Sequence, residues 1–301
     1  MTKSLLLFLC LSIELPLANA TPEEFWSTWS DGMAEVNAYQ IDQNRYGEKR
    51  SGHIYLIYVT EPFSRKRKVK VSEYDAQNSD HTIALKLNII ERFQTGIYDY
   101  RLMTSHFVDA TRQMRPIKSV FSSQEWCGVT YERLEWSDRE ATLIVDSYFD
   151  GESQRETFDQ HLWSVDHLLI TARGLQRGGP SEVTSLDGPW IGSAKDRRMK
   201  HLPTALYSAK PHFQSPTHLR TPLGQTEVRP LSYQKASGAS CILSIELQSP
   251  HRIMGWRCND GEIAKLLRSK RLPYWKLTRA ADRGSLKGLG VKEDDLIQYV
   301  K

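Results

Sequence analysis

The stretch that decides the fold is LKLNIIERFQTGIYDYRL, residues 85–102. Apolar and polar side chains alternate from Leu85 to Ile89 and again from Tyr98 to Leu102, and the pair Thr95-Gly96 lies between the two runs. A period of two residues is that of a strand with one buried face, and glycine favours the tight turn between paired strands. These residues therefore predict an antiparallel hairpin.

Short apolar runs separated by turn residues continue along most of the chain. Tyr46-Gly47 and Asp150-Gly151 are further turn pairs. Further strands are predicted at His53–Val59, Pro116–Gln124, Gly128–Trp136, Ala141–Phe149, Thr204–Ser208, His218–Arg220, Gln225–Tyr233 and Pro273–Thr278. Strands at such short spacing favour an antiparallel meander over βαβ units, so the predicted fold class is mainly β with minor α.

Three segments predict helices. Thr21–Trp29 begins with a proline and two glutamates, which suit the positive end of a helix. Thr157–Gly174 begins with a capping-box pattern and carries an apolar stripe that ends at a glycine. Glu262–Arg268 is predicted to form one or two helical turns. Gly178–Pro203 is rich in Gly, Pro, Ser and charge, which predicts a long loop or a boundary.

Residues 1–20 are typical of an export signal. A lysine precedes the mainly apolar run Leu5–Leu17, and Ala18-Asn19-Ala20 is a small-residue cleavage site. The predicted organisation is a signal peptide followed by a single β-rich domain, residues 21–301, with a candidate subdivision near 176–203. We expect an exported protein of the periplasm or outer envelope.

Composition excludes some functions and leaves others open. Lys plus Arg number 40 and Asp plus Glu 36, a net charge of +4 that is weaker than a nucleic-acid binder needs, so no nucleic-acid partner is predicted. Basic residues gather at Arg65–Lys70 and at Arg268–Arg271. These clusters favour either contact with anionic lipid or polysaccharide, or solvated strand edges protected from pairing.

The cysteines predict one disulfide. If Cys241–Leu247 and Arg252–Cys258 are two strands of a hairpin, Cys241 faces Cys258, Leu243 faces Trp256 and Ile245 faces Met254. Directly opposed residues lie ~4.5 Å apart at Cα, within disulfide range. Cys127 is then left over. A small buried core residue is its expected role, since free cysteines are among the most buried side chains.

Motifs for catalysis and metal binding are missing. The sequence has no phosphate-binding Gly-rich loop, no Gly-x-Ser-x-Gly and no His-Glu-x-x-His, and His161 and His167 are spaced too far around a helix to share a metal. No catalytic residue, metal or cofactor is therefore predicted. For an enzyme, His106 as a base or Cys127 as a nucleophile would be the candidates.

Aromatic residues are concentrated in the first half of the chain. They favour either core packing or the lining of a ligand cavity, because concave sites are mostly apolar with few polar groups. The residues predicted to bind a ligand are Trp29, Tyr98, Tyr100, Trp126 and Tyr131.

A series of short motifs resembles a family of exported bacterial proteins with no established function. The motifs are Trp29–Gly32 with Ala34-Glu35, Tyr46-Gly47, Val59–Phe63, Thr95–Tyr100 and Phe121–Gly128. Some relatives carry an automatic label as a septum formation inhibitor Maf; this chain shows no matching nucleotide-site motif, and export argues against that activity. The C-terminal third, with Gly224–Thr226 and the Trp256 hairpin, is similar to periplasmic lipoprotein-carrier-like half-barrel proteins. That resemblance implies a large curved antiparallel sheet or half-barrel with one or two packed helices.

Together these patterns predict an exported, non-catalytic envelope protein that binds an apolar or amphipathic ligand in the concave face of its sheet. A lipid or other amphipathic envelope component is the expected partner, with contact to a membrane surface. The alternative is an envelope-directed hydrolase that uses His106 or Cys127.

Overall fold

The computed structural model describes residues 23–159, 162–183, 186 and 188–289, so the predicted signal peptide lies outside the described residues. The helices are α1 (Glu23–Trp29), α2 (Leu168–Thr171), α3 (Ala194–Lys200) and α4 (Gly284–Lys287), with 3-10 turns η1 (Val165–His167), η2 (Leu175–Arg177), η3 (Pro180–Glu182), η4 (Tyr274–Lys276) and η5 (Ala280–Arg283). The strands are β1 (Ala34–Arg45), β2 (Glu48–Ser64), β3 (Val69–Lys70), β4 (His81–Thr95), β5 (Tyr98–Asp109), β6 (Arg115–Glu125), β7 (Gly128–Trp136), β8 (Ala141–Ser147), β9 (Gln154–Phe158), β10 (Trp163–Ser164), β11 (Trp190–Ile191), β12 (Leu206–Tyr207), β13 (His212–Phe213), β14 (Thr217–Thr221), β15 (Gly224–Gln234), β16 (Ser240–Glu246), β17 (Ile253–Cys258) and β18 (Ile263–Leu272).

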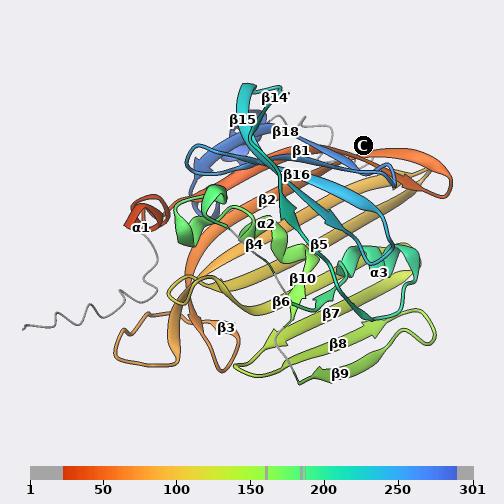
Figure 1. Cartoon of the computed structure of the whole chain (residues 1–301), viewed down its shortest axis with the longest axis horizontal. Coiled ribbons are helices and arrows are strands. Elements are labelled where there is room, and N and C mark those ends of the chain that lie inside the picture. Colours follow the sequence, from red (N-terminus) through yellow and green to blue (C-terminus); the bar gives the residue numbers. More distant parts are fainter. Residues whose placement is uncertain (1–22, 160–161, 184–185, 187, 290–301) are drawn as a thin grey trace, which may run out of the picture.

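Fifteen strands form one open antiparallel sheet in the order β13-β15-β16-β17-β18-β1-β2-β4-β5-β6-β7-β8-β9, with β14 and β3 paired at its sides. β1 lies between β2 and β18, so the first and the last strand of the sequence are neighbours within the sheet. Figure 1 shows that the sheet is strongly curved and that α2 and α3 lie on its concave side. The predicted mainly β class with a large curved antiparallel sheet and few helices is confirmed.

The hairpin predicted at residues 85–102 is the β4–β5 pair. Thr95 pairs with Tyr98 across the turn, and Leu87 pairs with His106 farther along. Leu85, Leu87 and Leu102 are buried, as the alternation requires. The predictions at 53–59, 116–124 and 128–136 are likewise found in β2, β6 and β7.

Four local predictions are wrong, and in the first two pairing with a neighbouring strand outweighs a local signal. Residues 154–158 form strand β9 on the edge of β8 instead of opening a helix, and the helical part of that segment is confined to η1 and α2. Residues 263–272 form β18 between β1 and β17 instead of a helix. Residues 274–276 form a 3-10 turn instead of a strand. The predicted loop at 178–203 contains β11 and α3.

The predicted disulfide is present. Cys241 and Cys258 are bonded, with Cα atoms 4.1 Å apart, and Leu243 pairs with Trp256 as predicted. The register then shifts by one residue, so that Ile245 pairs with Ile253 and not with Met254. The shift adjoins Gly255, whose φ of 152° is one that glycine adopts without strain.

The main core lies between α1, α2 and the concave face of the sheet. Its buried side chains include Trp29, Leu56, Leu87, Leu168 and Ile170. One ion pair is enclosed in it: both terminal nitrogens of Arg173 bind the carboxylate of Glu35, at 2.9 and 3.0 Å. Both side chains are almost fully buried, which leaves this part of the concave face closed.

Candidate ligand-binding site

Helix α3 covers the other part of the concave face, on the right in Figure 1. Asp196 lies in its first turn, and Arg197, Arg198 and Lys200 lie in its last, a distribution that the helix dipole favours. His201 ends the helix in the left-handed conformation, with φ 51°. The helix is short and polar, so its attachment to the sheet has to come from outside its own sequence.

Four basic side chains of α3 fasten it to four different parts of the sheet. Lys195 pairs with Glu91 of β4, Arg197 with Glu132 of β7, Arg198 with Glu125 of β6, and Lys200 with Asp260 in the turn before β18. Apart from Lys200 and Asp260, these groups are largely buried. Helix α3 is therefore held across the hollow of the sheet by ion pairs together with the packing of Ala194 and Met199 in a hydrophobic cluster of the sheet.

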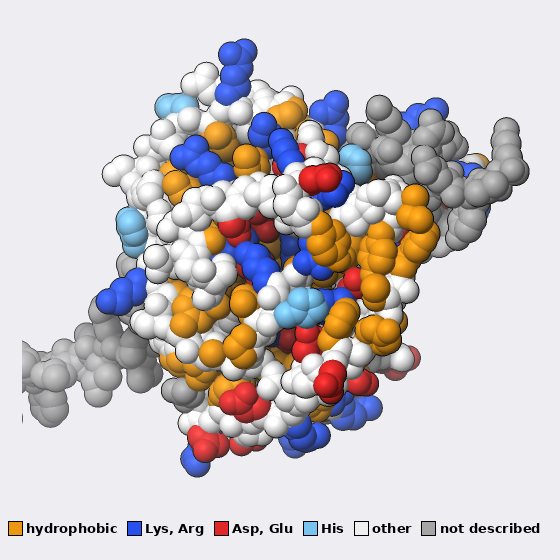
Figure 2. Space-filling view, turned by 90° about the vertical axis from the view of Figure 1, so that its right-hand side faces the viewer, with side chains coloured by type: hydrophobic (Ala, Val, Ile, Leu, Met, Phe, Trp, Pro, Cys, Tyr) orange, Lys and Arg blue, Asp and Glu red, His pale blue; other side chains and the backbone are white. Residues whose placement is uncertain are grey.

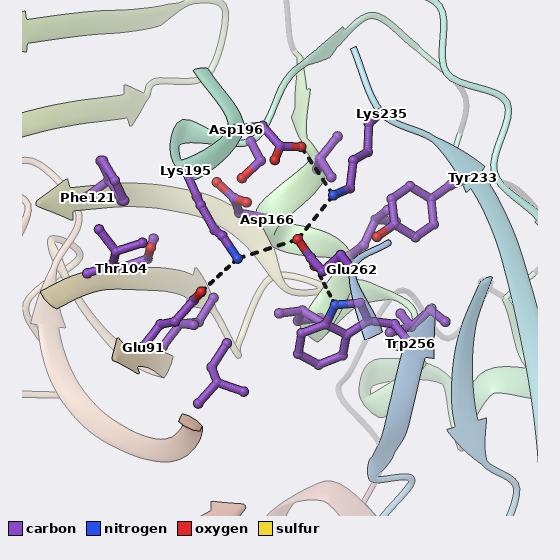
Figure 3. Close-up of a pocket in the computed structure, with 18 residues that line it drawn as sticks. Glu91, Thr104, Phe121, Asp166, Lys195, Asp196, Tyr233, Lys235, Trp256 and Glu262 are labelled. Carbon is purple, nitrogen blue, oxygen red and sulfur yellow. Dashed lines mark hydrogen bonds and ion pairs between the residues drawn. The ribbon is translucent and has the colours of Figure 1, made fainter. Parts of the chain in front are cut away.

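The side chains beneath α3 form what we call the interior charged cluster: Glu91, Lys195, Asp196, Lys235 and Glu262 (Figure 3). Lys195 Nζ lies 2.9 Å from Glu91 Oε1 and 3.4 Å from Glu262 Oε2. Lys235 Nζ lies 3.2 Å from Glu262 Oε2 and 3.5 Å from Asp196 Oδ2. The cluster is thus a chain of alternating charges in which Lys195 joins two of its carboxylates and Lys235 joins two and also contacts Asp260, at 3.4 Å.

The electrostatics keep this cluster ionised. Burial alone would raise the pKa of Glu262, but Lys195, Lys235 and the indole N–H of Trp256, which donates to Glu262 Oε1 at 2.6 Å, hold that pKa well below its usual range. For Lys195 and Lys235, burial by itself would lower the pKa. The surrounding carboxylates have the larger effect, so the pKa of both lysines is raised above its usual value. Glu262, Lys195 and Lys235 are therefore charged at neutral pH.

A cavity of about 80 Å³ lies beside the cluster. Its walls combine the charged groups with apolar side chains of the sheet and of α2, including Ile54, Ile89, Leu102, Leu168, Leu243 and Trp256. Asp166 also lines it. The Asp166 carboxylate accepts a hydrogen bond from the Ala194 N–H at 3.1 Å, and within the described part of the chain it has no ion-pair partner. One wall of the cavity thus carries an unneutralised carboxylate.

The cavity lies toward one end of the sheet, which we call the turn end: the end where the β1–β2, β4–β5, β6–β7 and β8–β9 hairpins turn. Glu262 and Asp260 lie in the β17–β18 turn at the same end. Figure 2 looks onto this end and shows a hollow with acidic and basic side chains inside and hydrophobic side chains around it. The charged interior is therefore reached from the turn end.

Three of the predicted ligand-binding residues are brought together. Tyr98 contacts both Tyr100 and Trp126, with ring centroids 5.0 and 5.9 Å apart. Tyr100 is buried and stacks on Phe93 in a cluster that also contains Ala194 and Met199, at the two ends of α3. Trp126 is exposed at the β6–β7 turn. These three lie beside α3 at the turn end, outside the cavity lining.

The other two predicted ligand-binding residues lie apart. Trp29 is buried in the main core, where the guanidinium of Arg173 lies 5.5 Å from its ring centroid. Tyr131 is partly exposed on β7, and the buried residues Thr130 and Glu132 on either side of it show that it points to the convex face.

The two candidates for catalysis lie in different surroundings, one buried and one exposed. His106 is buried on β5, its ring 4.7 Å from that of His167, and burial lowers its pKa to about 4. Cys127 was expected to be buried, and this is wrong: it lies exposed in the β6–β7 turn, because its neighbours complete a hairpin and place it at the tip.

Sequence reasoning missed the interior charged cluster, although part of its signal was present. Glu91 has the same parity as the apolar Leu87 and Ile89 on β4, and Glu132 has the same parity as Leu134 on β7. A carboxylate at an inward position requires a partner. The partners, on α3, lie far away in the sequence in a segment that was predicted to be a loop.

No family model matches the chain, and no curated protein or solved structure matches it either. Among the described residues, no helix has the length and apolar character needed to cross a membrane. The same residues contain no group of three or more His, Cys, Asp or Glu side chains arranged to hold a metal ion.

Proposed function

We propose that this protein is a non-catalytic binding protein that holds an amphipathic ligand in the concave face of its sheet, with a cationic head group, such as an amine, against Asp166. The observation that carries the proposal is the charge of the cavity. Its lining has four carboxylates, on Glu91, Asp166, Asp196 and Glu262, and two ammonium groups, on Lys195 and Lys235. In a cavity of low dielectric constant, this excess of negative charge favours binding of a positively charged ligand group.

The remaining lining favours an apolar body on the same ligand. Leucine, isoleucine, valine and aromatic side chains make up much of the wall. A cavity of about 80 Å³ holds a head group and not a whole lipid. On the other side of α3, a groove of about 550 Å³ shares Phe121 with the cavity and offers room for the chain of the ligand.

The compartment belongs to the same proposal. The signal-like residues 1–20 and the Cys241–Cys258 disulfide support an exported protein, because disulfides persist in oxidising compartments. An envelope lipid or another amphipathic envelope component is then the natural ligand class.

Calorimetric titration with three probes of equal chain length tests the choice of head group. Below their micelle-forming concentrations, we expect dodecylamine to bind about tenfold more tightly than dodecanol or dodecyl sulfate, a difference of about 1.4 kcal/mol. Asp166→Asn keeps the oxygen that accepts from Ala194 and removes the charge, so it should weaken dodecylamine binding about tenfold and leave dodecanol binding unchanged.

Glu140→Gln is the matched control, because Glu140 is exposed and lies in the β7–β8 turn at the opposite end of the sheet. It should leave all three affinities unchanged. Tighter binding of dodecyl sulfate, or an Asp166→Asn protein that binds the amine as well as the wild type, would refute the cationic head group. Native mass spectrometry of protein isolated from its own cells would then identify any ligand that it does carry.

A further inference from the structure

The turn end carries a row of exposed apolar side chains. Four hairpins lie side by side in the sheet, β1–β2, β4–β5, β6–β7 and β8–β9, and all turn at this end. Each tip has one large apolar or aromatic residue whose side chain is mostly exposed, although the Tyr46 hydroxyl is hydrogen-bonded to that of Tyr100. Their exposed fractions are 65% for Tyr46, 77% for Ile97, 64% for Trp126 and 63% for Tyr148.

These four are the most exposed large hydrophobic residues in the described part of the chain; the next, Val129, is exposed by 57%. Nothing in hairpin formation requires them, since polar residues with Gly or Asn serve tight turns as well or better. Exposing four such side chains at four successive tips is unfavourable in water, so their concentration at one end indicates a surface that is covered in use.

The arrangement favours a lipid surface over a protein partner. Two strands separate neighbouring tips, so the tips are about 10 Å apart and the row spans roughly 30 Å. A protein interface needs a contiguous apolar centre, which separated tips do not supply. Three of the four residues are Tyr or Trp, whose rings have an apolar body and a polar group and concentrate at the membrane–water interface.

Most of the charges between the tips are compensated. Lys49 binds Asp42, Arg50 binds Glu48, and Arg92 and Arg101 share Asp99, so four basic and three acidic groups leave a net charge of +1. A surface with so small an excess of charge has only a weak preference for anionic lipid and suits neutral head groups. This distinguishes the turn end from the basic cluster Arg65–Lys70, which lies at the opposite end of the long strands.

We propose that Tyr46, Ile97, Trp126 and Tyr148 form a docking rim that inserts into the interfacial layer of a lipid bilayer. In this orientation the turn end contacts the membrane, and the hollow seen in Figure 2 faces the lipid. The docking rim acts through apolar insertion and does not depend on whether the cavity binds a ligand. It gives the exposed Trp126 a role that differs from the predicted one of lining a ligand cavity.

Flotation with vesicles of pure phosphatidylcholine tests the docking rim. The variant Ile97→Ser/Trp126→Ser/Tyr148→Ser removes three tips and keeps Tyr46, whose hydroxyl is hydrogen-bonded to that of Tyr100. Val69→Ser/Trp275→Ser/Tyr74→Ser is the matched control, since it removes the same kinds of side chain, exposed by 43, 42 and 46%, from other parts of the surface. We expect the rim variant to lose at least about tenfold in partitioning and the control to partition like the wild type.

Thermal unfolding of both variants checks that they are folded, and quenching of tryptophan fluorescence by brominated lipid should disappear with Trp126→Ser alone and persist with Trp275→Ser. Absence of wild-type binding to these vesicles would overturn the proposal. So would equal losses in the two triple variants, binding that requires anionic lipid and survives the loss of the tips, or a self-associated protein that the rim variant converts to monomer without any change in vesicle binding.

Discussion

The concave face of the sheet is covered in two different ways, by the α2 segment and by α3. The α2 segment packs apolar side chains, such as Leu168 and Ile170, into the main core and encloses a single ion pair. Helix α3 contributes four basic side chains that bind four acids, and its apolar contacts come from two residues, Ala194 and Met199. Burial of apolar area is a large stabilising term, whereas buried ion pairs contribute little net stability. The comparison indicates that α2 holds the fold together and that α3 is a cover over the charged cavity.

The largest effect should come from the ion pair in the α2 segment. Arg173→Met leaves the buried Glu35 carboxylate without its partner, and we expect the free energy of unfolding to fall by about 3–5 kcal/mol. Urea denaturation at neutral pH measures the change. Arg271→Met is a suitable control, because its partner Asp31 is partly exposed and the expected loss is ~1 kcal/mol or less. Similar losses in the two variants would remove the distinction between core and surface.

Protonation of His106 should have the next largest effect. Its ring is buried beside His167 and near Asp166, and its pKa is lowered to about 4 in the folded protein. As the pH drops below 6.5, the His106 ring therefore takes up a proton in the unfolded chain but stays neutral in the folded chain. The free energy of unfolding consequently falls as the pH drops below 6.5. Between pH 7 and 5 this amounts to about 2 kcal/mol.

His106→Leu should flatten the dependence of the unfolding free energy on pH within that window, and His218→Leu, at an exposed histidine, should not. Denaturant titrations at pH 7, 6 and 5 provide the measurement. An unchanged pH dependence in His106→Leu would show that the ring is accessible to protons in the folded state.

The smallest effect on stability should come from α3. Arg197→Met removes the partner of Glu132, whose pKa is already raised by burial, with Arg197 only partly offsetting it. The freed carboxyl can take up a proton, so we expect a loss of about 1 kcal/mol at pH 5. The loss should grow toward pH 8, because a group with a raised pKa loses stability as the pH rises through that pKa.

Hydrogen exchange sharpens the same comparison. In Arg197→Met the amides of residues 194–202 should exchange faster than in the wild type, while those of residues 168–174 should not change. Faster exchange in both segments would mean that the α2 segment and α3 open together, and that α3 is not an independently opening cover of the sheet.

The sequence by itself determined the mainly β class, the β4–β5 hairpin, several further strands and the disulfide, but not β1, β9 or β18. The hairpins depend on residues close together in the chain: the alternation around Thr95-Gly96 sets the β4–β5 hairpin, and the two strands that flank residues 248–251 bring Cys241 opposite Cys258 despite the register shift near their turn. Local signals failed where a distant strand supplied the hydrogen bonds, as β1 does for β18.

Only the tertiary structure decided the site. The inward positions of Glu91 and Glu132 follow from strand parity, but their partners Lys195 and Arg197 come from a Gly- and Pro-rich segment with no clear periodicity. The alignment of Ile97 with Trp126 and Tyr148 in one rim likewise depends on which hairpins lie side by side. Electrostatic and apolar clusters of this kind join residues as far apart in the sequence as Glu91 and Glu262, and no local pattern records which segments the folded sheet brings together.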